Sequence, residues 1–362
     1  MINNNLENNI GIVKFSLIGF GNAARRLAEL LIEKEQEIAQ KYQTRFICTA
    51  IATAKHGVIT SDKEINLTLA LDKVKSNQSL TTLDGVISVT NSFQAISKSS
   101  ADIMIETSIL SLENGEPALS HIKQALLARQ DVVTANKGPL AFAASELLNL
   151  AKTQDRYLYY ESTMMDGTPV FNLVRHTLPL AKIHRIKGIV NSTTNFILSE
   201  MEEGRDFANA LAKAQNVGIA EADPSLDIDG WDAAVKACVL ANCLMNGELK
   251  PKDVNRLGIA NISLDEILTA QKAGKKIRLV MDIINNNGKI SASVLPTEID
   301  PSDVFYTIDA FSNVLTLETD LMGTLIIIEK DPTLTQTAYG LFSDLLSIIS
   351  ARKVNNEANS IT

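Results

Sequence analysis

The feature that most constrains the fold is a strand-like segment that leads through two glycines directly into a helix-like one. VKFSLIGF (13–20) is rich in β-branched and aromatic residues, and NAARRLAELL (22–31) carries apolar residues at helical spacing. Gly19 and Gly21 allow a tight turn and a close approach of backbone to a pyrophosphate, while the helix start offers free N–H groups to phosphates. Because Ala24 takes the third position of the Gly-x-Gly-x-x-Gly pattern, an ordinary turn is the alternative to a dinucleotide site.

Strand-like and helix-like segments alternate through the first 162 residues. The further strand-like segments are 45–52, 84–89, 101–107, 131–136 and 157–162, and the helix-like segments are 25–42, 116–130 and 144–154. A parallel sheet covered by helices is built from such units, and ligands bind at the carboxyl ends of its strands. The pattern predicts the α/β class, with a Rossmann-like doubly wound parallel sheet.

The rhythm changes after residue 162. A strand-like segment (182–190) precedes two helix-like segments that each end at a glycine (193–204 and 206–218). Two strand-like runs flank Asn-Asn-Asn-Gly within 275–295, which is typical of a β-hairpin. The predicted parts of the chain are 1–155, a dinucleotide-binding domain; 156–325, an α+β domain; and 326–362, a C-terminal segment whose helix returns to the nucleotide domain.

Composition argues against several kinds of protein. The 362 residues carry a formal net charge of −8 with no large basic block, which disfavours nucleic acid and anionic membranes as partners. No run of 18 apolar residues occurs, and the N-terminus has the character of a polar tail rather than a signal peptide. Three cysteines without a Cys-x-x-Cys pair and four scattered histidines predict neither a disulfide framework nor a metal cluster, and fit a reducing cytoplasm.

The end of the second strand bears on the choice of dinucleotide. NAD-preferring sites usually place an acid there to bind the ribose hydroxyls, whereas IATAKHG (51–57) has Thr53 and no acid. Lys55 would attract a 2′-phosphate, so the segment favours NADP, with NAD still possible. The alternative is that Lys55 is a solvated loop residue.

EADPSLDIDGWDAAVK (221–236) crowds five carboxylates next to one lysine. Asp232 and Lys236 are four residues apart, so they would share one face of a helix. Asp229 is placed to cap that helix from Gly230 onward. A solvated loop with a surface ion pair worth a few tenths of a kcal/mol is the alternative.

The same stretch has a second interpretation, a polar pocket for a cationic substrate. The carboxylates of Glu221 and Asp227 on the preceding loop would then face the cation, and Lys236 among these carboxylates is a candidate acid.

Several motifs together resemble those of the homoserine dehydrogenase family. They are GFGN (19–22), NGEPALSHIKQAL (114–126), VVTANKGPLAF (132–142), GIVNSTTNFIL (188–198) and AQNVGIAEADPSLDIDGWDAAVK (214–236). The resemblance covers residues 13–260 and continues more loosely to the end, and its last motif is specific where the glycine loop alone is not. It implies NAD(P)-dependent interconversion of L-homoserine and L-aspartate 4-semialdehyde, on the route to threonine and methionine, and a homodimer formed through the second domain, with the 275–295 hairpin as our candidate contact.

The resemblance also implies roles for individual residues. Lys236 would be the proton donor and Asp232 its partner. The substrate would be held by Glu221, Asp227, Lys137 and Thr193. The residues along the cofactor would be Gly19, Phe20, Gly21, Asn22, Ala23, Lys55, Thr107, Lys137 and Gly218.

YESTMMDGTPV (160–170) resembles the family's loop for a monovalent cation, sodium or potassium. The residues lining it, largely through backbone carbonyls, would be Glu161, Met164, Asp166 and Thr168. The family's version carries several glycines where this chain has Met-Met-Asp-Gly. Without a cation, the two methionines would be core residues.

Two departures from the family pattern leave the function open. Ser192 stands where the family has glycine, and residues 324–346 keep a Thr337-Ala338 helix start but lack the glycine-rich loop before it. The chain also ends soon after, without room for the regulatory ACT domain of longer members. The hypotheses are a homoserine dehydrogenase, another NAD(P)-dependent oxidoreductase acting on a small amino or oxo acid, and a non-catalytic dinucleotide-binding sensor. Intact Lys137, Asp232 and Lys236 oppose the sensor.

Overall fold

The structure, a computed structural model, describes residues 10–360, with backbone only for 355–360. The polar tail expected at the N-terminus begins in residues 1–9, outside the described part. Contacts divide the described chain into two compact units. Unit 1 holds residues 10–139, 146–169 and 333–360, and unit 2 holds residues 140–145 and 170–332.

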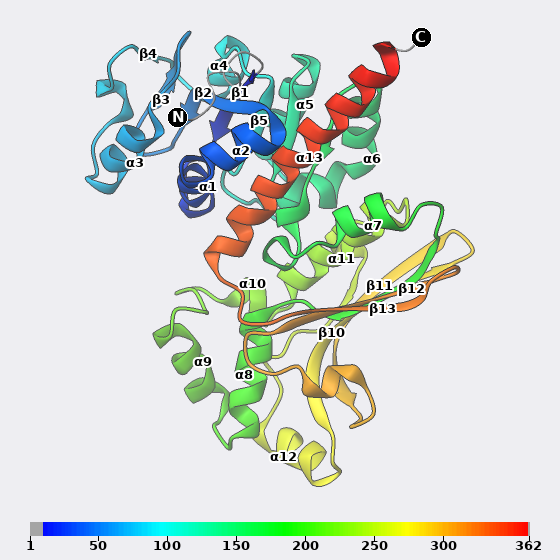
Figure 1. Cartoon of the computed structure of the whole chain (residues 1–362). Helices are drawn as coiled ribbons and strands as arrows, with labels where there is room; N and C mark the ends of the chain where they lie inside the picture. The colour runs from blue at the N-terminus through cyan, green and yellow to red at the C-terminus, as the bar shows by residue number, and fades with distance from the viewer. Residues whose placement is uncertain (1–9, 361–362) are drawn as a thin grey trace. The chain divides into compact units, whose positions relative to one another are not determined.

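Unit 1 is an α/β unit (Figure 1). Its strands are β1 (Gly11–Ile18), β2 (Thr44–Ala52), β3 (Val58–Thr60), β4 (Ile87–Ser88), β5 (Ile103–Glu106), β6 (Asp131–Thr134) and β7 (Leu158–Tyr159). Its α-helices are α1 (Asn22–Glu33), α2 (Glu35–Tyr42), α3 (Leu67–Lys75), α4 (Ser92–Lys98), α5 (Ala118–Leu127), α6 (Lys137–Thr153, shared with unit 2 at 140–145) and α13 (Leu334–Ser360). Its 3₁₀ turns are η2 (Leu80–Thr82), η3 (Glu161–Thr163) and η4 (Met165–Gly167).

The sheet of unit 1 has the strand order β4-β3-β2-β1-β5-β6-β7. Strands β2, β1, β5, β6 and β7 run parallel, which confirms the predicted doubly wound sheet. The edge strands β3 and β4 pair antiparallel instead, and the strand expected at 84–89 shrinks to two residues. The order reverses beside β1, which is where open α/β sheets bind ligands.

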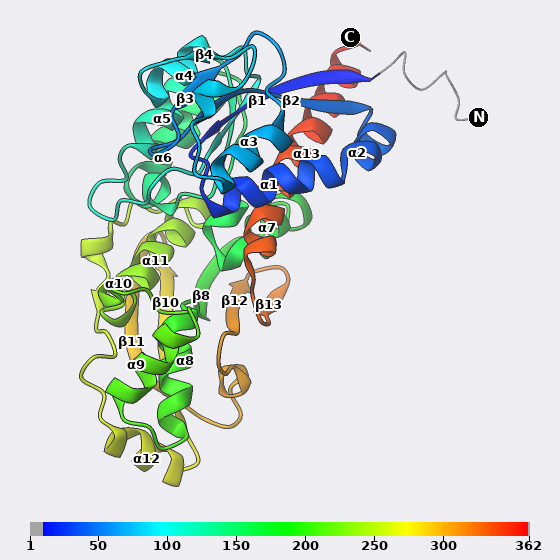
Figure 2. The ribbon, with the colours of Figure 1, turned by 90° about the vertical axis from the view of Figure 1, so that its left-hand side faces the viewer.

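Helix α13 packs into unit 1 although it lies far along the chain. Its buried apolar residues recur every three or four positions and so share one face: Ala338, Leu341, Phe342, Leu345, Ile348 and Ile349. That face meets Phe15 and Leu17 of β1, which alternate with Ser16 and therefore point to the same side of the sheet. Figure 2 shows α13 beside α1 and α2. Helices α4 and α5 pack on strands of the same sheet.

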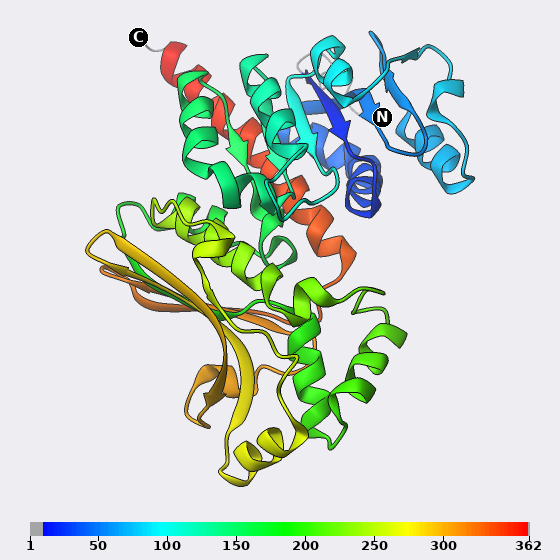
Figure 3. The ribbon, with the colours of Figure 1, turned by 180° about the vertical axis from the view of Figure 1, so that it is seen from behind.

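Unit 2 combines a sheet with helices (Figure 3). Its strands are β8 (Ile183–Ile189), β9 (Asn255–Arg256), β10 (Lys276–Asn286), β11 (Lys289–Ile299), β12 (Asn313–Thr319) and β13 (Gly323–Glu329). Its helices are α7 (Phe171–Thr177), α8 (Ser192–Glu202), α9 (Phe207–Asn216), α10 (Ser225–Ile228), α11 (Trp231–Leu244) and α12 (Leu264–Lys272), with 3₁₀ turns η5 (Pro251–Asp253) and η6 (Val304–Thr307).

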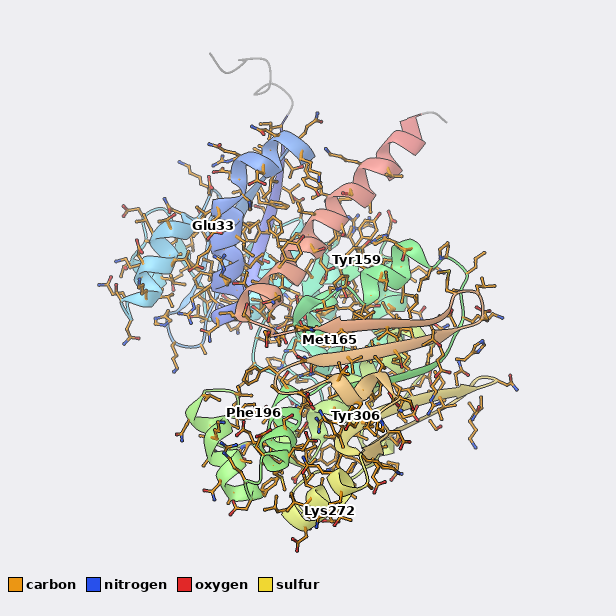
Figure 4. The ribbon with its side chains drawn as sticks, turned by 60° about the horizontal axis from the view of Figure 1, so that its bottom comes forward. Glu33, Tyr159, Met165, Phe196, Lys272 and Tyr306 are labelled. Atoms are coloured by element: carbon orange, nitrogen blue, oxygen red, sulfur yellow. The ribbon has the colours of Figure 1, made fainter. Side chains whose placement is uncertain are left out.

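The sheet of unit 2 has the order β13-β12-β8-β10-β11-β9 and is mostly antiparallel. The hairpin predicted around Asn-Asn-Asn-Gly is confirmed: β10 and β11 pair from Lys276 to Ile299, and Asn287 and Gly288 take the left-handed conformations that a tight turn needs. Helices α8 and α11 pack on these strands. Phe196 of α8, labelled in Figure 4, stacks on Phe311 with ring centroids 5.1 Å apart.

Two local expectations were wrong. The 25–42 helix is interrupted at Lys34, which separates α1 from α2. The stretch before Thr337 forms β13 and then α13 from Leu334, so the helix begins three residues earlier than expected. Among the described residues, no helix is long and apolar enough to cross a membrane.

Candidate active site

The glycine loop of unit 1 has the tight geometry that its sequence predicts. Gly19 has φ +97°, and a Cβ there would lie 2.3 Å from the Thr107 carbonyl oxygen, so only glycine fits. Thr107 Oγ1 in turn donates to the Gly19 carbonyl at 3.0 Å. Gly21 is the N-cap of α1, with no heavy atom near its would-be Cβ. The loop after β5 is thereby fastened to the loop after β1.

A cavity of about 900 Å³ opens at this edge of the sheet, a size suited to a cofactor. Five predicted cofactor residues line it: Gly19, Phe20, Gly21, Lys55 and Thr107. Asn22 and Ala23 instead form the first turn of α1; Asn22 lines a neighbouring cavity of about 400 Å³ and accepts from Arg25 Nη2 at 2.5 Å.

The charges around the larger cavity have one sign. Arg25 and the exposed Lys55 line it, together with His56, and no carboxylate is found among the described lining residues. Thr53 Oγ1 donates to the Gly57 carbonyl at 3.1 Å and accepts from the His56 backbone N–H at 2.7 Å. These bonds shape the turn that presents Lys55 at the rim of the cavity.

Lys137 is the first residue of α6, directly after β6. Its neighbour Asn136 caps the helix, because the Asn136 side chain accepts from the Gly138 N–H at 3.2 Å. The amide of Asn136 also donates to the carbonyls of Ser108 and Ile109. The loops after β5 and β6 are thus tied together, and this fixes the half-buried Lys137 at the ligand edge.

In unit 2, Asp232 and Lys236 of α11 form the pair that their spacing predicts. Lys236 Nζ lies 3.0 Å from Asp232 Oδ2, and it also donates to the Val190 carbonyl at the end of β8. Only 16% of the lysine side chain and 13% of the aspartate side chain are exposed. The pair is therefore held inside a structured site rather than on a solvated face.

Asn191 is the centre of this cluster, and sequence analysis did not assign it a role. Its Nδ2 donates to Asp227 Oδ1 at 2.7 Å and to Asp232 Oδ2 at 3.0 Å. Its Oδ1 caps α8 by accepting from the Thr194 N–H at 2.9 Å. An asparagine between a strand and a helix is a visible signal for a cap, but nothing in the spacing shows the two carboxylates that it bridges.

The predicted cap at Asp229 was wrong. Helix α11 begins at Trp231 with Gly230 as its N-cap, and no side chain caps it. Asp229 instead ends the short α10, and the left-handed Gly230 (φ +79°) turns the chain between the two helices. Cys238, two residues beyond Lys236, is a poor nucleophile, because burial raises the pKa of its thiol to about 12.

The other three predicted residues of unit 2 are Glu221, Thr193 and Gly218. Glu221 is exposed on the loop after α9. Thr193 is buried on α8 and its hydroxyl points to the Ile219 carbonyl at 3.4 Å, which holds that same loop. Gly218 has φ +80° and follows the end of α9, the geometry of a helix stop.

The predicted cation loop is tightly folded in unit 1. Met165, Asp166 and Gly167 all have positive φ, and a Cβ on Gly167 would lie 2.6 Å from the Gln336 carbonyl oxygen of α13. Glu161 and Met164 are buried, and Asp166 accepts from Thr337 Oγ1 at 3.1 Å; Thr168 follows the turn. Within the described part of the chain, no group of three or more His, Cys, Asp or Glu side chains could hold a metal ion.

The two departures from the family pattern lie on one hydrogen-bonded chain. Ser192 Oγ donates to the Phe311 carbonyl at 2.9 Å and lies 3.3 Å from Asn313 Oδ1. Asn313 Nδ2 donates to Glu329 Oε2 at 2.9 Å, and Glu329 is buried. The serine hydroxyl is therefore committed to protein groups.

Comparison with known proteins gives one consistent result. Residues 169–346 match the family model described as homoserine dehydrogenase. The chain is 32% identical to the NAD(+)-dependent homoserine dehydrogenase of Pseudomonas canavaninivorans (92% of this chain, 96% of that one) and 32% identical to the homoserine dehydrogenase of Methanocaldococcus jannaschii (93% and 98%). A solved structure from Archaeoglobus fulgidus, named only provisionally as a homoserine dehydrogenase, matches with TM-score 0.81 and 31% identity over 93% of this chain and 99% of that one.

Proposed function

The chain belongs to the homoserine dehydrogenase family of NAD(P)-dependent oxidoreductases, and from that premise we propose that Lys236 is its proton donor. The family's reaction interconverts L-homoserine and L-aspartate 4-semialdehyde in threonine and methionine biosynthesis. The observation that carries the proposal is the confined ion pair of Lys236 and Asp232, which the Val190 carbonyl and Asn191 hold in place.

The chemistry assigns each group a task. When bound, NAD(P)H supplies the hydride that reaches the aldehyde carbon. The carbonyl oxygen then becomes an alkoxide, and the Lys236 ammonium delivers a proton to it, so that homoserine forms. In the reverse direction Lys236 takes the proton back. Asp232 keeps the ammonium in one orientation, because the attraction between the two charges is stronger in a confined site than in water.

The carboxylates suit the other end of the substrate. Asp227 and Asp232 are held side by side by the Asn191 amide, and the exposed Glu221 lies on the nearby loop. We assign the substrate's α-ammonium group to Asp227 and Glu221, with Thr193 and Lys137 as further substrate contacts. Such charge-assisted bonds are about twice as strong as neutral ones.

The test is homoserine oxidation followed by absorbance at 340 nm, with NADP and with NAD. Lys236→Ala should lower kcat by about 10³-fold, the range for loss of a general acid. Lys213→Ala is the matched control, because Lys213 of α9 pairs with Glu200 of α8 and its side chain is 42% exposed. A Lys236→Ala enzyme whose kcat stays within a few-fold of wild type would refute the assignment. A panel of other small aldehydes, with NADPH or NADH as the reductant and loss of absorbance at 340 nm as the readout, tests for altered substrate choice.

For the cofactor we propose NADP over NAD. Lys55 stands at the cavity without an acidic neighbour in the 51–57 turn. One relative is named as NAD(+)-dependent, so membership of the family leaves the choice open. Lys55→Gln should weaken NADP binding about fivefold, the range for an exposed charge pair, and leave NAD binding unchanged. Lys63→Gln, an exposed lysine of the same unit, is the control.

We also propose a monovalent cation in the 161–168 loop. The loop is tightly turned, with left-handed Met165 and Asp166, and the carbonyls of Glu161 and Met164 accept the backbone N–H groups of Met164 and Gly167 at 3.3 and 3.1 Å. Asp166 and Thr168 would complete the set. Replacing potassium or sodium by a large organic cation should then lower activity; equal rates in all salts would count against the site.

We infer a homodimer through unit 2, with the β10–β11 hairpin as the contact, and a monomer by light scattering at micromolar concentration would exclude it. We keep 1–155, 156–325 and 326–362 as the functional division. The three cysteines, Cys48, Cys238 and Cys243, are buried or half-buried, and we propose the cytoplasm as location.

A further inference from the structure

Three side chains at the cofactor cavity form a hydrogen-bonded row that the proposed mechanism does not use. Ser92 Oγ lies 2.7 Å from His121 Nε2, and His121 Nδ1 lies 3.3 Å from Glu106 Oε1. The residues come from three elements: Ser92 begins α4, His121 lies on α5, and Glu106 ends β5. Glu106 and His121 are buried, with 0% and 2% exposure, whereas Ser92 is half-buried and lines the cavity with His121.

The direction of the row is fixed at its buried end. Glu106 is surrounded by donors: the Ser108 N–H at 3.2 Å, the Ser108 hydroxyl, and Thr134 Oγ1 at 3.4 Å from its other oxygen. A carboxylate only accepts hydrogen bonds, so His121 Nδ1 must be the donor toward it. In the neutral ring the second nitrogen, Nε2, then carries no proton and accepts from Ser92.

This direction determines what Ser92 offers to a ligand. With its proton engaged by His121, the Ser92 oxygen has only lone pairs left. It therefore repels a phosphate, which is itself an acceptor, and attracts a neutral donor such as a hydroxyl or an amide N–H. Phosphates have better places in the same cavity, at the glycine loop and at Lys55.

We propose that Ser92 is a cofactor-binding residue that accepts a hydrogen bond from a neutral donor group of the dinucleotide, a ribose hydroxyl or an amino or amide N–H. His121 and Glu106 are positioning residues that hold Ser92 as an acceptor. The inference rests on the proposed function in so far as the cavity of unit 1 holds NAD(P). It adds to this cavity, which the glycine loop also lines, a polar contact that selects for donors.

The test is direct binding of NADPH and NADH, followed by the fluorescence of the reduced nicotinamide without substrate. Ser92→Ala should raise the dissociation constant about five- to tenfold, the value of one hydrogen bond. Ser92→Thr keeps the hydroxyl and should restore most of the affinity. Ser97→Ala is the matched control, because Ser97 lies on the same helix and its hydroxyl bonds only to the Gln94 carbonyl in the described structure.

Fragments of the cofactor identify the donor. If ADP-ribose loses affinity for Ser92→Ala as NADPH does, the donor belongs to the adenosine or ribose part. If ADP-ribose binds both proteins equally while nicotinamide mononucleotide loses affinity, the donor lies on the nicotinamide side. Equal binding of every ligand to wild type and Ser92→Ala overturns the inference alone. A wild type that binds no NAD(P)H overturns the proposed function and this inference with it.

The tautomer of His121 tests the acceptor role of Ser92 independently of the binding affinities. Nitrogen-15 spectra of the four-histidine protein should show the His121 ring with its proton on Nδ1. Ser92→Ala should leave that tautomer unchanged, because Glu106 sets it. If Nε2 carried a proton instead, His121 would donate to Ser92, and the Ser92 hydroxyl would be left to donate to the ligand. The proposed acceptor role of Ser92 would then be wrong.

Discussion

Unit 1 and unit 2 each gather polar side chains around one central residue at the end of a strand, but the charge lies at the centre in unit 1 and around the centre in unit 2. In unit 1 the centre is Glu106, a carboxylate surrounded by neutral donors from Ser108, His121 and Thr134. In unit 2 the centre is Asn191, a neutral amide that holds two carboxylates beside an ammonium group. The two arrangements solve the same problem, because a buried charge must be met by hydrogen-bonding partners.

The two units differ in how exposed their charged side chains are. The carboxylate of Glu106 is fully buried. It acts on the cavity only by determining which atom donates in the hydrogen bond between Ser92 and His121. Asp232 and Lys236 are partly exposed, so their charges stay available to a substrate. A cofactor wall can work with oriented neutral groups, whereas an aldehyde turning into an alkoxide needs a charge beside it.

Among the tests of this comparison, the largest effect is expected from placing a charge at the unit 2 centre. Asn191→Asp places a third carboxylate beside Asp227 and Asp232 and removes both N–H donors, so like charges repel and the pair with Lys236 loses its support. We expect kcat/KM for homoserine to fall at least about 100-fold, or roughly 3 kcal/mol. Steady-state kinetics with saturating cofactor measure it.

Asn209→Asp is the control for that experiment. Asn209 is an exposed residue of α9, so the same chemical change there should leave kcat/KM within a factor of two. If Asn191→Asp were also nearly silent, the amide would be only a helix cap, and the comparison between the two centres would fail.

Much of the fold follows from local pattern. The strand–glycine–helix start, the parallel strands and the β10–β11 hairpin were predicted because their causes lie within a few residues. The Asp232–Lys236 pair was predicted for the same reason, since both residues lie on one helix four positions apart. The β12–β13 hairpin was missed, because its turn depends on Thr319, whose hydroxyl donates to the Gly323 carbonyl and accepts from the Met322 N–H.

The centres of both polar clusters escaped prediction for a common physical reason. Asn191 meets carboxylates 36 and 41 residues away, and Glu106 meets His121 and Thr134, 15 and 28 residues away on other elements. Tertiary packing makes those neighbours, and no period in the sequence reports it. The resemblance to a family brought the carboxylates and the lysine into view, but not the neutral residues that orient them.

Unit 1 has a second buried carboxylate, Asp131, which can be compared with Glu106. Asp131 pairs with a cation, whereas Glu106 is surrounded by neutral donors. Asp131, at the opposite end of the β5–β6 pair from Glu106, is fully buried and lies 2.6 Å from Arg352 of α13. Arg352→Met removes the guanidinium and leaves the carboxylate buried. We expect the free energy of unfolding at pH 7 to fall by about 2–3 kcal/mol, measured by urea denaturation followed by circular dichroism.

The pH dependence of that loss has a definite sign. Burial raises the pKa of Asp131, and Arg352 only partly offsets this. A carboxyl whose pKa is raised on folding stabilises most below its unfolded value, about 3.9, and that contribution is lost as the pH rises through the folded value. Arg352→Met should therefore cost less at pH 4 than at pH 7; an equal cost at both would mean that Asp131 is not the group affected. Arg205→Met, an exposed arginine paired with Glu200, is the control.

The smallest effects test the two centres through a matched pair of threonines. Thr134 Oγ1 donates to the Glu106 carbonyl at 3.1 Å and accepts from the Asn136 N–H, while Thr194 Oγ1 lies 2.9 Å from Asn191 Oδ1. Thr134→Val and Thr194→Val keep the shape of the side chain and should each lower the free energy of unfolding by about 1 kcal/mol.

The functional effects of the two variants should differ. Thr134→Val raises the dissociation constant of the reduced cofactor about threefold at constant kcat, because the row from Glu106 to Ser92 loosens. Thr194→Val lowers kcat about threefold at constant cofactor affinity, because the amide beside Asp232 loosens. If both variants changed the same parameter, the two centres would not serve separate ligands, and the contrast between a neutral cofactor wall and a charged substrate site would be lost.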